Sequence, residues 1–504
     1  MFDSLIRKIL SSKVYDVALE TSVDQAHFLS QKLNKTILFK REDQQPIHSF
    51  KCRGAYNKII NLPEFERQKG IIAASAGNHA QGVALAAQRL NVSAVIVMPT
   101  TTPDIKVRSV RSRGVEVLLF GDSFDDAYEE SLRLSSERQL TFIHPFDDID
   151  VIAGQGTVAL ELMRQVTQPI DAVFIPVGGG GLAAGMAAYI KYLRPEIKVI
   201  GVEPEDAASL SAALKADKRV LLESVGLFAD GVAVKQIGEE NFRILRKTCD
   251  DVITVTTDEI CAAVKDVFND VRSVSEPAGA VAVAGLKKYA TTSDTQGALV
   301  AVLTGSNVNF DRVGHIVERA ELGEKQEVIL AATIPERIGA FKNFCETLGN
   351  RNITEFNYRY SDHDEARVFA GIKVDHSPDA RLALFADLEN QGVPVVDLTD
   401  NEFAKMHLRH MVGGPRVVKN EQAFRFEFPE RPGALLKFLE TIGSRWRLTA
   451  FHYRNHGAAY GRVFVSFEAG EDEVVTLTDY FNDIGYAYYE ENANPAVSLF
   501  LDKV

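Results

Sequence analysis

The feature that most constrains the fold is an alternation of short apolar runs with longer stretches of helical periodicity between residues 36 and 306. Eight of these runs are rich in β-branched residues and have the length of strands. This alternation is typical of βαβ units around a largely parallel sheet, so the sequence predicts an α/β domain. The predicted strands are TILFK, GIIAAS, SAVIVMP, VEVLLF, DAVFIPV, KVIGVE, DVITV and ALVAVLT.

Polar or glycine-rich turns follow three of the predicted strands, at residues 75–79, 178–181 and 304–307. Ligands of parallel α/β sheets bind beyond the carboxyl ends of the strands. We therefore expect these three turns to meet at one binding crevice.

An internal repeat organises the chain after about residue 324. The segment beginning at Thr333 matches the segment beginning at Glu427, first at a spacing of 94 positions and then, after a one-residue slip, at 95. So dense a match predicts two related α+β modules in tandem, each with an apolar face to bury. The repeated residues of the first copy are Pro335, Glu336, Arg337, Gly339, Ala340, Phe344, Glu346, Thr347, Gly349, Arg351, Phe356, Tyr358 and Arg359.

Charge and cysteine content narrow the class of protein. At 504 residues the chain is long enough for several domains. A formal net charge of -13, without blocks of like charge, argues against nucleic acid or an anionic membrane as partner. Four scattered cysteines without a CxxC pair make disulfides and a thiolate zinc site unexpected. With neither a signal peptide nor an apolar run of membrane-spanning length, the sequence predicts a cytoplasmic protein.

Lys51, in HSFKCRGA, is the first candidate for chemistry. It falls in the first turn of a predicted helix that Ser49 could cap. The positive end of the helix dipole disfavours protonation of an amine, which helps to make it a nucleophile. Taken alone, the motif fits a solvated surface lysine better.

The turn SAGNHAQG, from Ser75 to Gly82, is the second candidate. Its small residues let a ligand approach the backbone, and the amides of the following helix suit a carboxylate. Ser75 and Asn78 could add hydrogen bonds. A capped strand-to-helix turn explains the motif equally well.

Four consecutive glycines, Gly178 to Gly181, lie between a predicted strand and a predicted helix. Their backbone N–H groups could surround a phosphate at the helix N-terminus. A rival interpretation is a dinucleotide fingerprint, because Gly178, Gly180 and Ala183 fit G-x-G-x-x-A and Glu203 ends the next strand. That interpretation leaves Lys51 and Asn78 without a role.

Taken in order, seven motifs resemble those of the fold type II pyridoxal-phosphate enzymes, and specifically of the biosynthetic threonine dehydratases. The resemblance covers nearly the whole chain. It implies largely parallel sheets flanked by helices in two catalytic subdomains, followed by two α+β ACT-like modules. The expected bounds are 1–323 for the catalytic domain, with a smaller subdomain inserted at roughly 40–150, and 324–415 and 421–504 for the modules. The motifs are HSFKCRGA, SAGNHAQG, IAGQGT, PVGGGGLAAG, FADGVAV, SEPAGA and LTGSNVN.

The resemblance also implies roles for individual residues. Lys51 would hold pyridoxal 5'-phosphate as a Schiff base and remove the Cα proton of the substrate. Asn78 would bond the ring 3-oxygen. Thr304 would serve the ring nitrogen, where the family usually has serine. The phosphate would be held by Gly178, Gly179, Gly180, Gly181 and Leu182, and the substrate carboxylate by Ser75, Gly77, Asn78 and His79.

The activity implied is β-elimination and deamination of L-threonine, and more weakly of L-serine, to 2-oxobutanoate and ammonia. This reaction commits threonine to isoleucine biosynthesis. The modules would bind isoleucine as inhibitor and valine as antagonist, in a homotetramer. Tyr358, Tyr453 and Arg454 would line the effector pocket, although the tyrosines could equally pack on their sheets.

Several alternatives stay open from the sequence. A serine dehydratase or racemase is one, and an inactive amino-acid-sensing protein is another, although the intact Lys51 argues against the latter. Related racemases and dehydratases hold a cation with two acids after the strand ending GVEP. Here Glu203 is followed by Ser209 in place of the second acid, so no tightly bound metal is expected. Glu276 receives no defined step.

Overall fold

The structure, a computed structural model, divides into two compact units, Met1–Gly323 and Glu324–Val504. No helix among the residues it describes is long and apolar enough to span a membrane. The described residues are 2–100, 102–121, 123–323, 326–349, 351–359, 364–375, 379–401, 404, 418, 420–429, 434–442, 446–454 and 460–494.

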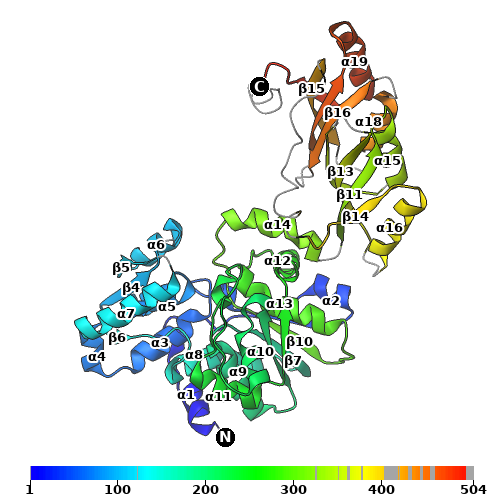
Figure 1. The fold of residues 1–504 in the computed structure, drawn as a ribbon. Coiled ribbons are helices and arrows are strands. Elements are labelled where there is room, and N and C mark those ends of the chain that lie inside the picture. Colours follow the sequence, from blue (N-terminus) through cyan, green and yellow to red (C-terminus); the bar gives the residue numbers. More distant parts are fainter. Residues whose placement is uncertain are drawn as a thin grey trace. The chain divides into compact units, whose positions relative to one another are not determined.

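The first unit contains a six-stranded sheet of order β1-β2-β10-β7-β8-β9 (Figure 1), in which only β1 runs antiparallel to its neighbour. The parallel strands coincide with apolar runs of the sequence. The short strand β1 is not among the predicted strands, because its sequence VDQ carries two polar residues. The strands are β1 (Val23–Gln25), β2 (Ile37–Arg41), β7 (Ile170–Pro176), β8 (Lys198–Pro204), β9 (Asp251–Val255) and β10 (Ala298–Leu303).

A four-stranded parallel sheet of order β5-β4-β3-β6 lies beside the larger one (Figure 1). Its strands are β3 (Ile71–Ala74), β4 (Ala94–Met98), β5 (Glu116–Leu119) and β6 (Thr141–Phe142). The helices of this unit are α1 (Asp3–Leu10), α2 (His27–Leu33), α3 (Lys51–Asn61), α4 (Glu64–Lys69), α5 (Asn78–Leu90), α6 (Asp104–Arg111), α7 (Phe124–Arg138), α8 (Ile149–Gln165), α9 (Gly181–Leu193), α10 (Ser209–Ala216), α11 (Glu239–Thr248), α12 (Thr257–Val271), α13 (Pro277–Ala290) and α14 (Asp311–Gly323).

Helices cover both faces of each sheet, as the continuous apolar strands require. Alternate residues of β10 show this for the larger sheet: Val300 and Val302 pack with α1, α8 and α9, whereas Leu299 and Ala301 pack with α12 and α13. In the smaller sheet, one face packs on α3 and α5 and the other on α7. The ends of the strands are therefore the parts of both sheets left for a ligand.

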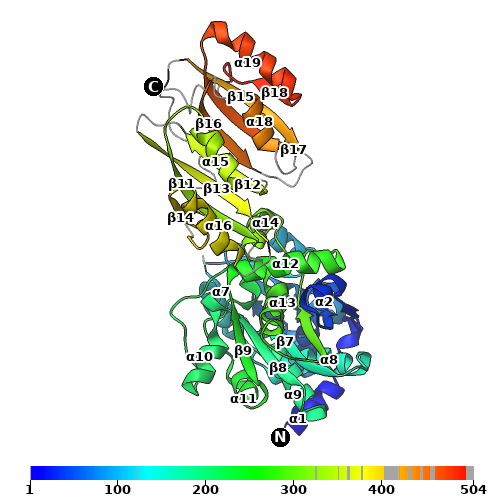
Figure 2. The same cartoon turned by 90° about the vertical axis from the view of Figure 1, so that its right-hand side faces the viewer.

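The second unit is a single antiparallel sheet of order β14-β11-β13-β12-β16-β17-β15-β18, with α15, α16 and α18 on one side (Figure 2). Its first half comprises β11 (Glu327–Pro335), α15 (Ala340–Leu348), β12 (Ile353–Arg359), β13 (Glu365–Lys373), α16 (Ala380–Asn390) and β14 (Val395–Asp397). Its second half comprises β15 (Glu421–Pro429), α18 (Ala434–Ile442), β16 (Arg447–Arg454), β17 (Tyr460–Glu468), α19 (Glu471–Ile484) and β18 (Ala487–Glu490).

The two halves are the two copies of the sequence repeat, and β12 pairs with β16 to join them. Asn357 lies opposite His452, and these two residues occupy the same position in their respective copies. Each copy is longer than the strand, helix and strand seen in the identities, because another two strands and a helix follow. The predicted class, α/β with parallel sheets followed by α+β modules, is confirmed.

Candidate active site

The three turns singled out in the sequence are linked by contacts within the first unit. The turn after β3 contacts the turn after β10, because the side-chain amide of Asn307 donates to Asn78 Oδ1 at 2.7 Å. Gly305 forms a β-bridge with Ser49, just before α3. The segment after β6 connects the remaining turn, since Phe146 packs where a side chain at Gly179 would lie.

Lys51 is the first residue of α3, and its Nζ donates to the carbonyl of Pro145 at 2.9 Å. The N-cap is Phe50, which already has helical dihedral angles; Ser49 lies one residue earlier and accepts only a long bond of 3.5 Å from Lys51 N. Burial lowers the pKa of Lys51 to about 8, against the charge of Glu276, which raises it. Burial, more than the helix end, thus favours a neutral amine.

The turn from Ser75 to His79 places Gly77 at the N-cap of α5. Ser75 Oγ accepts a hydrogen bond from Gly77 N at 3.2 Å. His79 is buried, and burial together with the charge of Lys51 lowers its pKa to about 3, so the imidazole is neutral. Its Nε2 lies 2.9 Å from the carbonyl of Ile143, which can only accept; Nε2 therefore carries the proton.

Thr304 follows β10 and is buried. Its Oγ1 donates to Ala278 O at 3.4 Å, and its own carbonyl accepts from Phe50 N at 3.3 Å. The second bond connects the end of β10 directly to the residue before Lys51, so the predicted catalytic lysine and the predicted ring-nitrogen partner are joined through the backbone.

The glycine run forms a cradle that side chains would fill. A Cβ at Gly178 would lie 2.8 Å from Val232 Cα, and one at Gly181 would lie 2.8 Å from Phe146 O. Gly180 has φ +94°, a conformation that L side chains rarely adopt, and a Cβ there would lie 2.6 Å from Ile237 Cδ1. The sequence therefore needs glycine here for both space and backbone conformation.

Five successive backbone N–H groups of this run, from Gly178 to Leu182, donate to no acceptor among the residues that the structure describes. They lie at the start of α9, where the helix dipole adds positive potential. Free amides in a concave turn at a helix N-terminus suit a phosphate group. This part of the chain fits a phosphorylated cofactor.

Residues after β6 and in α11 complete the cradle, and none of them was predicted from the sequence. Asn241 Nδ2 donates to Gly179 O at 2.7 Å and to Phe146 O at 3.1 Å. Asp147 accepts from the first amides of α11, including Glu239 N at 2.8 Å. The signal in the sequence was weak, because β6 has only two residues and the following HPFDD carries no known pattern.

The carboxylate of Glu203 binds backbone amides of the protein itself. The carboxylate of this buried residue accepts hydrogen bonds from Leu210 N at 2.7 Å and Ser211 N at 2.9 Å, at the start of α10. Burial raises its pKa to about 7. Its oxygens are therefore engaged, which removes the ribose partner that the dinucleotide interpretation needs. Among the described residues, no group of three His, Cys, Asp or Glu side chains could hold a metal.

The predicted effector residues lie on β12 and β16. Tyr358 is buried and its hydroxyl donates to Glu336 at 2.7 Å. Tyr453 is half-buried against the core of the sheet and lies opposite Phe356. Arg454 ends β16, and its side chain lies outside the described residues.

Family models match both units of the chain. The model described as pyridoxal-phosphate dependent enzyme matches residues 15–305. The model of the C-terminal regulatory domain of threonine dehydratase matches twice, at residues 318–408 and 412–501. Fold, cradle and matches together define a pyridoxal-phosphate-dependent enzyme with a duplicated regulatory domain.

Individual relatives narrow this class. The L-threonine dehydratase biosynthetic IlvA of Burkholderia multivorans is 52% identical over 98% of this chain and 99% of its own length. The processed threonine deaminase isoform 2 of Solanum lycopersicum matches with a TM-score of 0.62 and 48% identity over 64% of this chain and 94% of that chain. Serine racemase from Dictyostelium discoideum matches with a TM-score of 0.56 and 32% identity over 61% and 98%. The chain belongs to the biosynthetic threonine dehydratases, which confirms the resemblance seen in its motifs.

Alanine at Gly180 tests the cradle. The added Cβ would contact Ile237 and Asn241 and force a strained φ, so we expect the dissociation constant for pyridoxal phosphate to rise about tenfold or more. Equilibrium dialysis of the apoenzyme against the cofactor measures it.

The matched control is Gly114→Ala. Gly114 has φ +79° but nothing within 4 Å of a Cβ, so this variant carries backbone strain without the steric conflict. Equal loss of cofactor affinity in both variants would contradict the assignment of Gly180 to the cradle.

Proposed function

We propose that the chain converts L-threonine to 2-oxobutanoate and ammonia, and acts more weakly on L-serine. The observation that supports this most strongly is that one segment contacts both Lys51 and the glycine run. The Lys51 amine, which burial favours in its neutral form, donates to Pro145 O, and the next residue, Phe146, lies against Gly179 and Gly181. The amides from Gly178 to Leu182 donate to no acceptor among the described residues. A relative named as a threonine dehydratase, identical at 52% of positions over 98% of the chain, supports the choice of substrate.

Lys51 would anchor the cofactor covalently, and its amine would be the base that removes the Cα proton of the substrate. Bound pyridoxal phosphate supplies the electron sink that makes this proton acidic. Amides of the cradle hold the phosphate, and Thr304 offers a hydroxyl to the ring nitrogen. Neutral His79, with Ser75, Gly77 and Asn78, lines the loop proposed to take the substrate carboxylate.

Threonine and serine differ by one methyl group, so contact with that group gives only about 1–3 kcal/mol of discrimination. The regulatory region favours the threonine assignment over a racemase. The matched serine racemase is covered over 98% of its length by 61% of this chain, so it offers no counterpart to the second unit.

The second unit is the proposed sensor of isoleucine, with valine as antagonist. Tyr358, Tyr453 and Arg454 belong to the two strands that join the repeats, which supports a pocket shared by both copies. An effector inhibits only if it binds one conformation better than another. The homotetramer and the cytoplasmic location remain predictions.

Keto-acid formation from L-threonine and L-serine, each with and without isoleucine, tests the proposed function. We expect threonine to have the higher kcat/KM, by about tenfold or more, since one methyl group gives about 1–3 kcal/mol. Isoleucine should inhibit, with valine reversing the inhibition. Equal rates from both substrates together with indifference to isoleucine would contradict the assignment.

In the same assay, Tyr453→Ala tests whether Tyr453 belongs to the isoleucine pocket. It should raise the isoleucine concentration needed for half-maximal inhibition. Tyr489→Ala is its control, because Tyr489 is an exposed tyrosine of the same sheet, in β18. Identical inhibition curves for Tyr453→Ala and the unmodified enzyme would exclude Tyr453 from the effector pocket.

A further inference from the structure

The side-chain amide of Asn78 is held from two sides. Asn307 Nδ2 donates to Asn78 Oδ1 at 2.7 Å, and Asn78 Nδ2 donates to Glu276 Oε1 at 2.6 Å. Asn307 Nδ2 also donates to the carbonyl of Ile47 at 2.7 Å. Three residues from separate segments thus form one chain of hydrogen bonds beside Lys51.

This chain fixes which way each amide faces. The carbonyl of Ile47 can only accept, so Asn307 must present its nitrogen there. The second hydrogen on that nitrogen then meets Asn78 Oδ1, and Asn78 Nδ2 is left facing Glu276. Turning the Asn78 amide over would place oxygen against the carboxyl of Glu276 and nitrogen against the nitrogen of Asn307.

In this arrangement one N–H of the Asn78 side chain is not used by the protein residues described. Its Nδ2 carries two hydrogens and Glu276 takes one; the other has no acceptor among the described residues. Asn78 is only partly buried, so this second hydrogen is open to solvent and to a ligand that can accept from it. The spare N–H is therefore the group available to a cofactor oxygen.

Glu276 is built into this position. It is the N-cap residue of α13, yet its carboxyl accepts no cap hydrogen bond from that helix. Its backbone N–H donates to Gly305 O at 3.2 Å, and a Cβ at Gly305 would collide with Glu276 Oε1. Glycine at 305 thus leaves the space in which this buried carboxyl reaches Asn78.

We infer that Glu276 is a positioning residue: together with Asn307 it fixes the Asn78 amide so that its spare N–H is presented to the ring 3-oxygen of pyridoxal phosphate. The inference rests on the role proposed above for Asn78. Glu276, to which no step is assigned from the sequence, thereby receives a function exerted through another side chain.

Charged groups from several elements surround this carboxyl. Burial and then the charge of Asp230 raise the pKa of Glu276 to about 7, while the Asn78 hydrogen bond, Lys106 and Arg312 lower it. Lys51 faces it too, since Glu276 raises the pKa of that amine. As pH rises through about 7, Glu276 becomes an anion and its bond from Asn78 becomes charge-assisted. The spectrum of the bound cofactor should therefore titrate in this range.

The experiment compares Glu276→Ala, Asn307→Ala and Asn78→Ala in the full-length enzyme. Equilibrium dialysis gives the dissociation constant of pyridoxal phosphate, and absorbance gives the position of its visible band. Each variant should bind the cofactor about tenfold more weakly, the value of one hydrogen bond, and should displace the band in the same direction. Combining Glu276→Ala with Asn78→Ala should weaken binding no further than Asn78→Ala alone.

Glu276→Gln keeps the size and an acceptor oxygen but cannot ionise. It should bind the cofactor within about twofold of the unmodified enzyme, because the hydrogen bond from Asn78 persists. It should also lose the spectral titration near pH 7. This variant separates a positioning role from a general loss of structure, which circular dichroism of each apoenzyme also monitors.

Three results would overturn the inference. In the first, Glu276→Ala leaves the cofactor affinity and the visible band unchanged. In the second, the effect of Glu276→Ala adds in full to that of Asn78→Ala, which would mean that Glu276 does not act through Asn78. In the third, Asn78→Ala changes neither affinity nor band in a chain that still binds the cofactor; the inference then fails while the proposed function stands. Absence of any visible band in the unmodified enzyme with added cofactor would instead reject the proposed function, and this inference with it.

Discussion

Alanine in place of Lys51 is expected to abolish the visible absorption of the bound cofactor and to lower kcat by at least about 10²–10⁴-fold, the range for loss of a positioned base. Lys51 Nζ lies 2.9 Å from Pro145 O, beside the residue that packs on the glycine run, and no other lysine is proposed for this step. Absorbance after gel filtration with excess cofactor, followed by a keto-acid assay, measures both effects.

Lys58→Ala is the matched control. Lys58 lies on the same helix, but its Nζ pairs with Asp148 at 2.7 Å. This variant should retain the visible band and most of the turnover. A Lys51→Ala protein with the band and rate of the unmodified enzyme would remove Lys51 from the proposed chemistry.

The lowered pKa of Lys51 gives the same residue a pH signature. An amine attacks an aldehyde only when neutral, and below its pKa of about 8 Lys51 is mostly protonated. The rate at which the apoenzyme captures pyridoxal phosphate should therefore rise with pH through about 8 and level off above it. At pH 7.5 the neutral fraction exceeds that of an ordinary lysine on the order of a hundredfold.

Replacing Arg53 with methionine is expected to cause the largest loss of stability, about 3–5 kcal/mol, because it leaves buried carboxylates without their cation. Arg53 is fully buried two residues after Lys51. Its guanidinium donates to Glu42 at 2.7 and 2.8 Å and to Glu161 at 2.5 and 2.9 Å. Thermal unfolding of the apoenzyme would show the loss as a lower apparent melting temperature.

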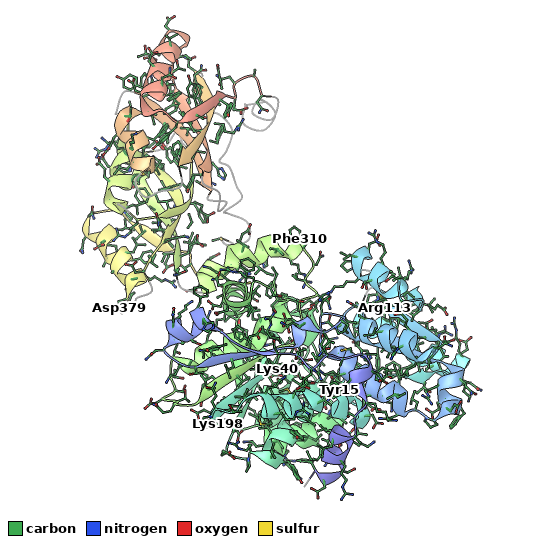
Figure 3. The ribbon with its side chains drawn as sticks, turned by 180° about the vertical axis from the view of Figure 1, so that it is seen from behind. Tyr15, Lys40, Arg113, Lys198, Phe310 and Asp379 are labelled. Carbon is green, nitrogen blue, oxygen red and sulfur yellow. The ribbon has the colours of Figure 1, made fainter. Side chains whose placement is uncertain are left out.

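Further groups complete this network: Lys40 and Thr21 are buried, and Tyr15 is exposed. Lys40 donates to Glu161 at 2.7 Å and Tyr15 donates to it at 2.9 Å; both donors are labelled in Figure 3. Thr21 donates to Glu42 at 2.6 Å. Two cations and two anions are thus balanced within the core, and they tie α3, which carries Lys51, to β2 and α8.

Two variants control the Arg53 experiment. Arg164→Met removes an exposed arginine of α8 that binds Glu20, and it should cost no more than about 1 kcal/mol. Arg53→Met combined with Glu42→Gln removes one charge of each sign and should recover part of the loss. Equal melting temperatures for Arg53→Met and the unmodified enzyme would contradict a stabilising network.

The effect of Arg53 should also depend on pH. Although burial raises the pKa of Glu42, the charge and hydrogen bonds of Arg53 outweigh it and hold that pKa below the ordinary value. Stability from this pair is present above the unfolded pKa of a glutamate and is lost as pH falls through the lower folded value. Without Arg53 the carboxyl prefers to be protonated, so the difference between variant and unmodified enzyme should shrink as the pH is lowered.

Local patterns in the sequence predicted the elements that carry the site. The apolar runs have strand length and are rich in β-branched residues, and the four glycines need a turn that accommodates no side chains. The repeat predicted paired modules because the same residue types recur in the same order. These signals act over a few residues or recur at a fixed spacing, so they can be read without knowing which segments meet.

Longer-range contacts were not predictable in this way. Asn307 and Glu276 lie far along the chain from Asn78, and only the fold brings their amide and carboxyl groups within hydrogen-bonding distance. The Arg53 network likewise joins residues up to 146 positions apart. Even Ser49 as the helix cap was wrong, because Phe50 takes up the helical conformation first.

The sequence by itself determined the class of fold, the position of the glycine cradle after a strand, the candidate lysine and the duplication of the second unit. Only the tertiary structure decided which acceptor oxygens and which N–H groups already form hydrogen bonds within the protein. Among the described residues, Glu203 accepts from the amides of α10, whereas the amides from Gly178 to Leu182 and one hydrogen of the Asn78 side chain meet no acceptor. The physical reason is that a hydrogen bond forms according to distance and direction in space, which residue type and spacing do not specify.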